Sequence, residues 1–216
     1  MAKKKSPSGE SYHMNEGANK LPDHLDPEKV LRADAQENRE QILQTACKLF
    51  AEKGLVVPIS TIAREAGIGV GTVYRHFPTK EALFNAINVG YKQKFIEEAR
   101  ALINAADPGK AFFDFFFHVM EECFTNRALR DSFRIGAIRL RKATSGVWLD
   151  FQLACADLLT QAQHAKAVRE DIDIMDLFVF MSGLLTVADE PDDVSNQSRF
   201  NQWMSIVRDG LGYQST

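Results

Sequence analysis

The chain has 216 residues, of which 45% are hydrophobic and 25% are charged, and its formal net charge is -3. These proportions describe a globular protein long enough to bury one or two cores, and they exclude collagen-like, mucin-like and wholly disordered chains. They also exclude a uniformly basic surface, although not a local basic face. Basic residues exceed acidic ones only in residues 35–82, whereas residues 83–216 have an acidic excess.

Three cysteines, Cys47, Cys123 and Cys155, are widely separated and form no C-x-x-C pair. This spacing indicates neither a zinc site nor a disulfide framework, so we expect free thiols in a reducing compartment. No apolar run reaches the length of about 18 residues that a membrane span requires, and the first residues lack the apolar stretch of a secretion signal. We therefore expect a soluble cytoplasmic protein without a cofactor.

Residues 1–34 contain three prolines and show no hydrophobic periodicity, which predicts a disordered tail. From Ala35 onward, apolar residues recur at spacings of three and four, and no segment shows the alternation of a β-strand. The chain is therefore predicted to be all-α, with about nine helices. We expect one from Ala35 to Gly54 and one from Pro58 to Gly67, followed by 70–76, 79–103, 110–126, 128–142, 146–168, 173–188 and 196–211.

The segment 60–77 has the features of two short helices joined by a tight turn. Ala63 is small enough for the helices to cross closely, and Gly67 tolerates the positive φ that such a turn requires. The apolar residues spaced to hold the pair together are Ile62, Ile68 and Val73. A helix-turn-helix of this kind places its second helix in the major groove of DNA, while the first helix crosses the backbone.

The residues left exposed on the second helix suit contact with nucleic acid. The hydroxyl, imidazole and ammonium groups suited to phosphate belong to Thr72, Tyr74, His76 and Lys80. The small residues that let the backbone approach base edges are Gly69, Val70 and Gly71. Val70 suits a thymine methyl and Arg75 suits guanine, while Ser60 and Arg64 are candidates for base edges or backbone. Taken alone, these residues also fit an ordinary helix pair with a solvated Tyr-Arg-His face.

From about Arg39 to Phe84, the chain resembles the DNA-binding domain of TetR-type transcriptional regulators. The resemblance is carried by Leu-Phe-Ala-Glu-Lys-Gly at 49–54, Ile-Ala-Arg-Glu-Ala-Gly-Ile at 62–68, and the run from Gly71 to Phe84. It implies a homodimeric, repressor-like protein whose recognition helices enter successive major grooves of a palindromic operator. It also implies phosphate contacts from Thr72, Tyr74, His76 and Lys80. One family feature is absent, because Pro58 and Ile59 stand where members often have a phosphate-binding threonine.

Residues 162–171 resemble, more loosely, the C-terminal domain of an SbtR-like subtype of this family. The resemblance implies that the C-terminal helices bind a small ligand. We therefore expect a tail over residues 1–34, a helix-turn-helix DNA-binding domain over 35–82, and a helical ligand-binding and dimerisation domain over 83–216. The expected partners are a double-stranded DNA operator, an unidentified small-molecule effector and a second copy of the chain.

Phenylalanine is concentrated in residues 110–151, which contain eight of the fifteen in the chain. Five of these lie within positions 112–117 and cannot all face one side of a helix. They form either a plain aromatic core or the lining of a ligand pocket. The residues predicted to line a pocket are Phe116, His118, Met120, Cys123, Arg134, Trp148, Phe151 and Met181. Arg134 would orient an anionic ligand, unless it is a surface charge.

Helix 173–188 is apolar on almost all sides, which predicts that one side packs on its own chain and the other on a partner. The last helix carries a similar set of residues, so the two helices together predict a twofold-symmetric four-helix interface. The residues predicted at this interface are Phe178, Met181, Leu185, Phe200, Trp203 and Val207. Core packing within one chain is the alternative for the last helix.

Asp114, His118 and Glu122 lie at i, i+4 and i+8, a spacing that suits a metal ion or acid–base chemistry. No second set of ligands is apparent, and the sequence has no nucleophile elbow, phosphate loop or dinucleotide fingerprint. We therefore do not expect an enzyme. The alternative hypothesis is an all-helical metal-dependent enzyme that uses Asp114, His118 and Glu122. Another alternative is a helical interaction module whose Tyr-Arg-His surface binds protein instead of DNA.

Overall fold

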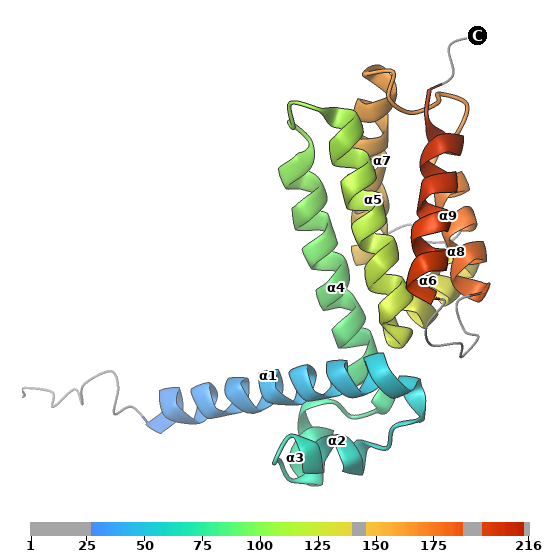
Figure 1. Ribbon diagram of the computed structural model, residues 1–216. Coiled ribbons are helices and arrows are strands. Elements are labelled where there is room, and N and C mark those ends of the chain that lie inside the picture. The colour runs from blue at the N-terminus through green and yellow to red at the C-terminus, as the bar shows by residue number, and fades with distance from the viewer. Residues whose placement is uncertain (1–26, 140–145, 188–195, 214–216) are drawn as a thin grey trace, which may run out of the picture. The chain divides into compact units, whose positions relative to one another are not determined.

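The computed structural model describes residues 27–139, 146–187 and 196–213, apart from the side chains at 27–29, 134–139, 187 and 196 (Figure 1). Every regular element in these ranges is helical, and an isolated antiparallel bridge joins Val168 to Gly212. The helices are α1 (Pro27–Lys53), η2 (Gly54–Val56), α2 (Ile59–Glu65), α3 (Val70–His76), α4 (Lys80–Leu102), α5 (Pro108–Thr125), α6 (Arg127–Arg139), α7 (Val147–His164), α8 (Ile174–Val187) and α9 (Asn196–Leu211). The prediction of an all-α fold is confirmed.

The helix boundaries agree with the sequence prediction to within a few residues, except at the start of α1. This helix begins at Pro27 rather than at Ala35. Proline is favoured at the first helical position, since its missing N–H would have no partner there, and residues 28–37 contain no glycine to interrupt the helix. The predicted tail is therefore helical from Pro27, and its remainder lies outside the described residues.

The chain divides into two compact units, Met1–Asn38 and Arg39–Thr216. The second unit has two hydrophobic cores. The smaller core is built from α1 to α4 and includes Ile42, Phe50, Ile62, Val73 and Leu83. The larger core is built from α4 to α9 and includes Phe95, Phe116, Phe151, Phe178 and Phe200. In the larger core, α7 packs against both α4 and α5, and α6 packs against α8.

Capping residues fix where the two long helices at the centre of this unit begin. The hydroxyl of Thr79 accepts a hydrogen bond from the amide of Ala82 (3.0 Å) at the start of α4. The carboxylate of Asp107 accepts one from the amide of Lys110 (2.9 Å) at the start of α5, where Pro108 is the first helical residue. Across the described parts of the chain, no helix combines the length and hydrophobicity needed to cross a membrane.

Candidate nucleic-acid interface and apolar cavity

A tight turn between α2 and α3 fixes how these two short helices cross. Gly67 has a φ of 67°, in the left-handed region that favours glycine. The amide of Gly67 donates to the carbonyl of Arg64 (3.1 Å), and the amide of Ile68 donates to the carbonyl of Ala63 (2.9 Å). No neighbouring atom lies within 4 Å of the place that a Cβ at Gly67 would take. Backbone conformation, not crowding, therefore explains the glycine.

Helix α3 has one buried side and one exposed side. Val73 is fully buried in the smaller core. The exposed face consists of Val70, Gly71, Tyr74 and Arg75, whose spacing places them on one side of the helix. Val70 is 40% exposed and Tyr74 is 48% exposed. Thr72 and His76 are half-buried along one edge of this face, so the helix presents a valine, a tyrosine and an arginine outward.

Three more predicted contact residues flank this face. Ser60 is exposed on α2, Gly69 is exposed at the cap of α3, and Lys80 is half-buried at the start of α4. We call the nine predicted residues together the recognition surface: Ser60, Gly69, Val70, Gly71, Thr72, Tyr74, Arg75, His76 and Lys80. Arg64, which lies nearby, forms an exposed ion pair with its neighbour Glu65 (Nη2 to Oε1, 3.0 Å). All nine residues are thus accessible at least in part.

A hydrogen-bonded junction connects α1 with α4 and α6. The hydroxyl of Tyr91 on α4 accepts a hydrogen bond from Nδ2 of Asn126 (2.9 Å) and lies 3.2 Å from Sγ of Cys47 on α1. Burial raises the pKa of Tyr91, so the phenol stays protonated. Asn126 also caps α6, because its Oδ1 accepts a hydrogen bond from the amide of Leu129 (3.1 Å). The sequence signals this role of Asn126 only by the preference of asparagine for helix caps.

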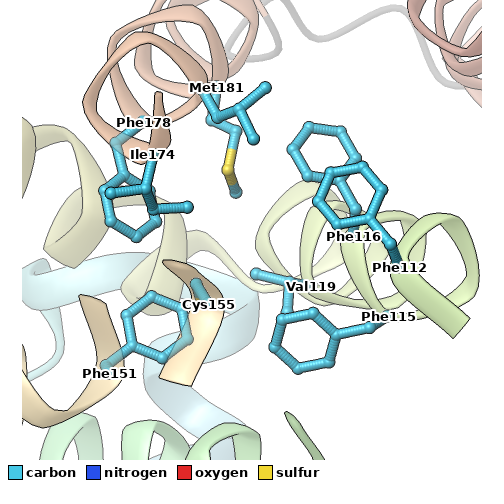
Figure 2. A pocket seen from close by; sticks show the side chains of 10 residues that line it. Phe112, Phe115, Phe116, Val119, Phe151, Cys155, Ile174, Phe178 and Met181 are labelled. Atoms are coloured by element: carbon cyan, nitrogen blue, oxygen red, sulfur yellow. The ribbon is translucent and has the colours of Figure 1, made fainter. Parts of the chain in front are cut away.

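An apolar cavity of about 20 Å³ lies between α5, α7 and α8 (Figure 2). Its lining includes Phe112, Phe115 and Phe116 from α5, Phe151 from α7, and Phe178 and Met181 from α8. A space of this size holds about one water molecule. The cavity in this conformation is therefore too small for an organic ligand, which would have to displace some of the aromatic rings.

Only part of the predicted pocket lining is found at this cavity. Phe116, Phe151 and Met181 line it. Met120 and Cys123 are buried in the larger core but are not among the lining residues, and Trp148 is half-buried. The side chain of Arg134 lies outside the described residues. His118 does not line this cavity: it lies on the outward side of α5 with 45% of its side chain exposed, at an open surface hollow that Phe117 and Arg208 also line.

His118 instead lies between two glutamates. Its Nδ1 is 2.9 Å from Oε1 of Glu98, and its Nε2 is 3.9 Å from Oε1 of Glu122. Asp114, the third residue of the alternative metal site, forms an ion pair with Lys110. Within the ranges that the structure describes, no three His, Cys, Asp or Glu side chains are placed to hold a metal ion. The geometry therefore gives no support to the metal-dependent enzyme.

The residues predicted at a dimer interface lie in the core of their own chain. Phe178, Met181, Leu185, Phe200 and Val207 are at most 4% exposed, and Trp203 is half-buried. The apolar side chains that remain exposed on α8 and α9 are Val179 (63%), Phe180 (44%) and Ile206 (61%). The structure thus packs the predicted residues within their own chain, and a helix that is apolar all round does not reveal from its sequence which side its own chain covers.

Comparison with known proteins relates both parts of the chain to transcriptional regulators. Residues 42–87 match the family described as bacterial regulatory proteins, tetR family, and residues 107–213 match the C-terminal domain of SbtR-like transcriptional regulators. Over 54 residues, the chain is 50% identical to an HTH-type transcriptional regulator of Staphylococcus aureus (strain USA300). That match covers 24% of this chain and 29% of the relative.

Two solved structures resemble a larger share of the chain. One is a TetR transcription regulatory protein from Mycobacterium vanbaalenii, which is 35% identical, with a TM-score of 0.57 over 84% of this chain and 99% of that one. The other is a TetR transcriptional regulator from Streptomyces coelicolor, which is 27% identical, with a TM-score of 0.60 over 82% of this chain and 99% of that one. These likenesses include the C-terminal helices as well as the helix-turn-helix.

Proposed function

The chain belongs to the TetR family of transcriptional regulators, and from this premise we propose that it is a homodimeric repressor that binds a palindromic operator and is released by a small effector. The observation that carries the proposal is the outward face of α3. This helix has no acidic residue, ends in Arg75 and His76, and is held by the buried Val73 and the turn at Gly67. A basic helix presented in this way suits the major groove.

The recognition surface divides into two chemical groups. Thr72, Tyr74, His76 and Lys80 carry hydroxyl, imidazole and ammonium groups that contact phosphates and set the position of the protein on the duplex. Val70 and Arg75 contact base edges, the first through a thymine methyl and the second through guanine, while Gly71 lets the backbone approach. Because phosphate contacts release counterions, binding is expected to fall steeply as salt rises. A surface that binds protein instead would not show this dependence on a duplex.

The dimer in this proposal forms through the outward sides of α8 and α9. An apolar groove of about 400 Å³ runs between these helices, and Ile172, Phe180, Ile206 and Leu211 are among the residues that line it. Exposed apolar side chains around such a groove favour contact with a partner surface. A twofold-symmetric contact between copies would present two recognition helices to the two halves of a palindrome.

Effector release follows from the way the larger core joins the helix-turn-helix. An effector that enters the cavity must displace rings on α5, α7 and α8, and α4 packs against α7. Through the hydrogen bonds of Tyr91, a movement of α4 or α6 would then also move α1. Both recognition helices must fit half-sites about 34–36 Å apart, so a small rotation removes much of the affinity. No catalytic step is required, and the expected place of action is the cytoplasm.

The proposal is tested by selecting bound duplexes from a random pool with the full chain. The expected result is an inverted repeat whose half-sites are separated by one turn of the duplex, or by a multiple of it. Enrichment of a single unrepeated motif would contradict the dimeric arrangement, and no enrichment at all would contradict DNA recognition. Repeating the binding measurement at several salt concentrations then separates contact with phosphates from a protein-binding surface.

A further inference from the structure

Lys92 is a charged residue inside the larger core. It lies on α4, is 2% exposed, and donates a hydrogen bond to Oγ of Ser132 on α6 (3.2 Å). Its ammonium also lies 4.3 Å from the centre of the Trp148 ring and 5.9 Å from that of Phe133. Lysine is almost never fully buried without a paired charge. Among the residues that the structure describes, no carboxylate forms an ion pair with Lys92.

The surroundings of Lys92 satisfy its charge incompletely. Among its partners in the described ranges, Ser132 and two aromatic faces supply partial negative charge, and no carboxylate supplies a full one. Burial accordingly lowers the pKa of Lys92 to about 8. One turn earlier on the same side of α4, Asn88 is 5% exposed, and its Oδ1 has no hydrogen-bond partner. Lys92 and Asn88 thus both keep unused capacity to form hydrogen bonds on one side of α4, which is rare in a packed core.

A single aromatic ring contacts both the surroundings of Lys92 and the lining of the apolar cavity. The centre of the Phe151 ring is 5.7 Å from that of Phe133 and 6.0 Å from that of Trp148, the two rings beside the ammonium. It is also 5.6 Å from the ring of Phe178, on the wall of the cavity (Figure 2). Phe151 therefore lies between the lining of the cavity and the aromatic rings beside Lys92.

We propose that Lys92 is the anion-binding residue of the effector site and that the effector is a monocarboxylate with an apolar body. The carboxylate would pair with the ammonium and with Ser132, while the apolar body would occupy the cavity that opens when Phe151 rotates. One buried cation balances one negative charge, whereas a phosphate dianion would bring an uncompensated charge into an apolar core. This inference rests on the proposed function, since it names the class of effector.

The position of Lys92 gives such an anion a direct connection to the DNA-binding part. Lys92 follows Tyr91, which forms the junction with Cys47 and Asn126. A carboxylate that pulls the ammonium away from the Trp148 and Phe133 rings would shift the same turn of α4 that carries Tyr91. The charge of the effector would then contribute to release as well as to affinity.

The test is thermal unfolding of the full chain in the presence of hexanoate, octanoate and benzoate, each compared with its matching alcohol and with octyl phosphate. We expect at least one carboxylate to raise Tm more than its alcohol does and more than octyl phosphate does. In Lys92→Met, the affinity for that carboxylate should fall by about tenfold or more, because a charge-assisted hydrogen bond is lost, and the advantage over the alcohol should disappear. Lys94→Met removes the same charge from an exposed position of α4 and should respond as the unmodified chain does.

Three results would overturn the inference. The first is that no carboxylate stabilises the protein more than its alcohol, and the second is that Lys92→Met keeps the preference, as a purely structural lysine would allow. The third is stronger stabilisation by octyl phosphate than by octanoate. Lys92→Gln measures the same loss if Lys92→Met does not fold. Duplex selection without a carboxylate is independent of all three, so an inverted repeat with no carboxylate preference refutes this inference and leaves the proposed function standing.

Discussion

Tyr74 is the most informative single residue of the recognition surface, because it is 48% exposed and extends from the middle of α3. If its hydroxyl donates to a phosphate, Tyr74→Phe should weaken binding to every duplex by about tenfold to a hundredfold, since a hydrogen bond to a charged group is worth about 1.5–3 kcal/mol. Fluorescence anisotropy with the selected operator and with an unrelated duplex measures both losses. Tyr213→Phe changes another exposed tyrosine, outside the recognition surface, and should have no effect. A loss confined to the operator would assign Tyr74 to base recognition instead.

Lys92 gives a prediction about pH that does not depend on any ligand. Its pKa falls from 10.5 to about 8 on folding, so between these values the unfolded chain binds more protons and the free energy of unfolding rises with pH. Relative to Lys92→Met, the unmodified chain should gain about 1 kcal/mol from about pH 7 to about pH 9. Urea unfolding at each pH measures the difference, and a constant difference would show that Lys92 carries no such shift.

The comparison with Lys92→Met also reduces the effect of two other buried groups. Burial raises the pKa of the thiols of Cys123 and Cys155, which would lower stability at alkaline pH. Cys155 contributes equally in both proteins, whereas Lys92→Met also removes a charge that lowers the pKa of Cys123. Because burial has the larger effect on the pKa of Cys123, the difference between the two proteins still reports mainly on Lys92.

The residues of the recognition surface and Lys92 differ in how far the sequence reveals them. Tyr74 and Arg75 belong to one continuous local motif, so their exposure follows from the position of Val73 and from helical periodicity. The environment of Lys92 is built by residues distant in the sequence, including Ser132, which is 40 positions away. Its spacing of four residues before Ile96 and seven before Ala99, both buried, is the one local signal of burial. Periodicity cannot show that Trp148 and Phe133 would surround it.

At the scale of elements, substitutions at two glycines distinguish the effect of local backbone conformation on folding stability from its effect on DNA binding. Gly67 has a positive φ, so Gly67→Ala should lower the free energy of unfolding by about 1–2 kcal/mol. Gly71 lies inside α3 with open space around a Cβ, so Gly71→Ala should raise it by about 0.5–1 kcal/mol. Because Gly71 lies on the exposed face, the same change should weaken operator binding. Calorimetry measures the change in stability of each variant, and fluorescence anisotropy measures its operator affinity. A Gly71→Ala protein that binds DNA more tightly would contradict the close approach of the backbone to the DNA.

Helix α5 shows which part of a packing pattern can be read from sequence. The prediction that five phenylalanines in six positions cannot share one side is confirmed. Phe112 and Phe116 line the cavity with rings 5.9 Å apart, whereas the guanidinium of Arg208 on α9 lies 5.6 Å from Phe113 and 4.8 Å from Phe117. Periodicity defines these two sides, but it does not say which neighbouring helix each one meets. For the same reason, the sequence did not reveal that Phe178, Met181 and Leu185 are on the side of α8 that its own chain buries.

At the scale of the whole molecule, the small cavity means that, in the proposed mechanism, effector binding and conformational change are one event. A cavity of about 20 Å³ accepts no organic molecule without movement of its aromatic walls. An effector therefore stabilises a conformation that differs from this one, and its differential affinity for the two conformations sets how far DNA binding can shift. In the proposed mechanism, the hydrogen bonds of Tyr91 to Cys47 and Asn126 would transmit that shift from the larger core to α1.

The assembly of two chains is the condition on which recognition of a palindrome depends. Phe180 and Ile206 are 44% and 61% exposed and line the groove between α8 and α9. In the combined variant Phe180→Glu, Ile206→Glu, carboxylates buried in the proposed contact would repel across the twofold axis. Sedimentation should then show single chains at concentrations where we expect the unmodified protein to be dimeric. Operator affinity should then fall by at least about a hundredfold, because each chain engages one half-site without the other.

A matched change elsewhere distinguishes this effect from a general loss of solubility or fold. Leu153 is 55% exposed on α7, so Leu153→Glu introduces one such carboxylate at another exposed apolar position. It should leave both the mass in solution and the operator affinity unchanged. Since the two replaced interface residues are exposed within the single chain, the variant should keep its helical content by circular dichroism. If that variant stays dimeric and binds the operator normally, then the contact between copies is formed by a different surface.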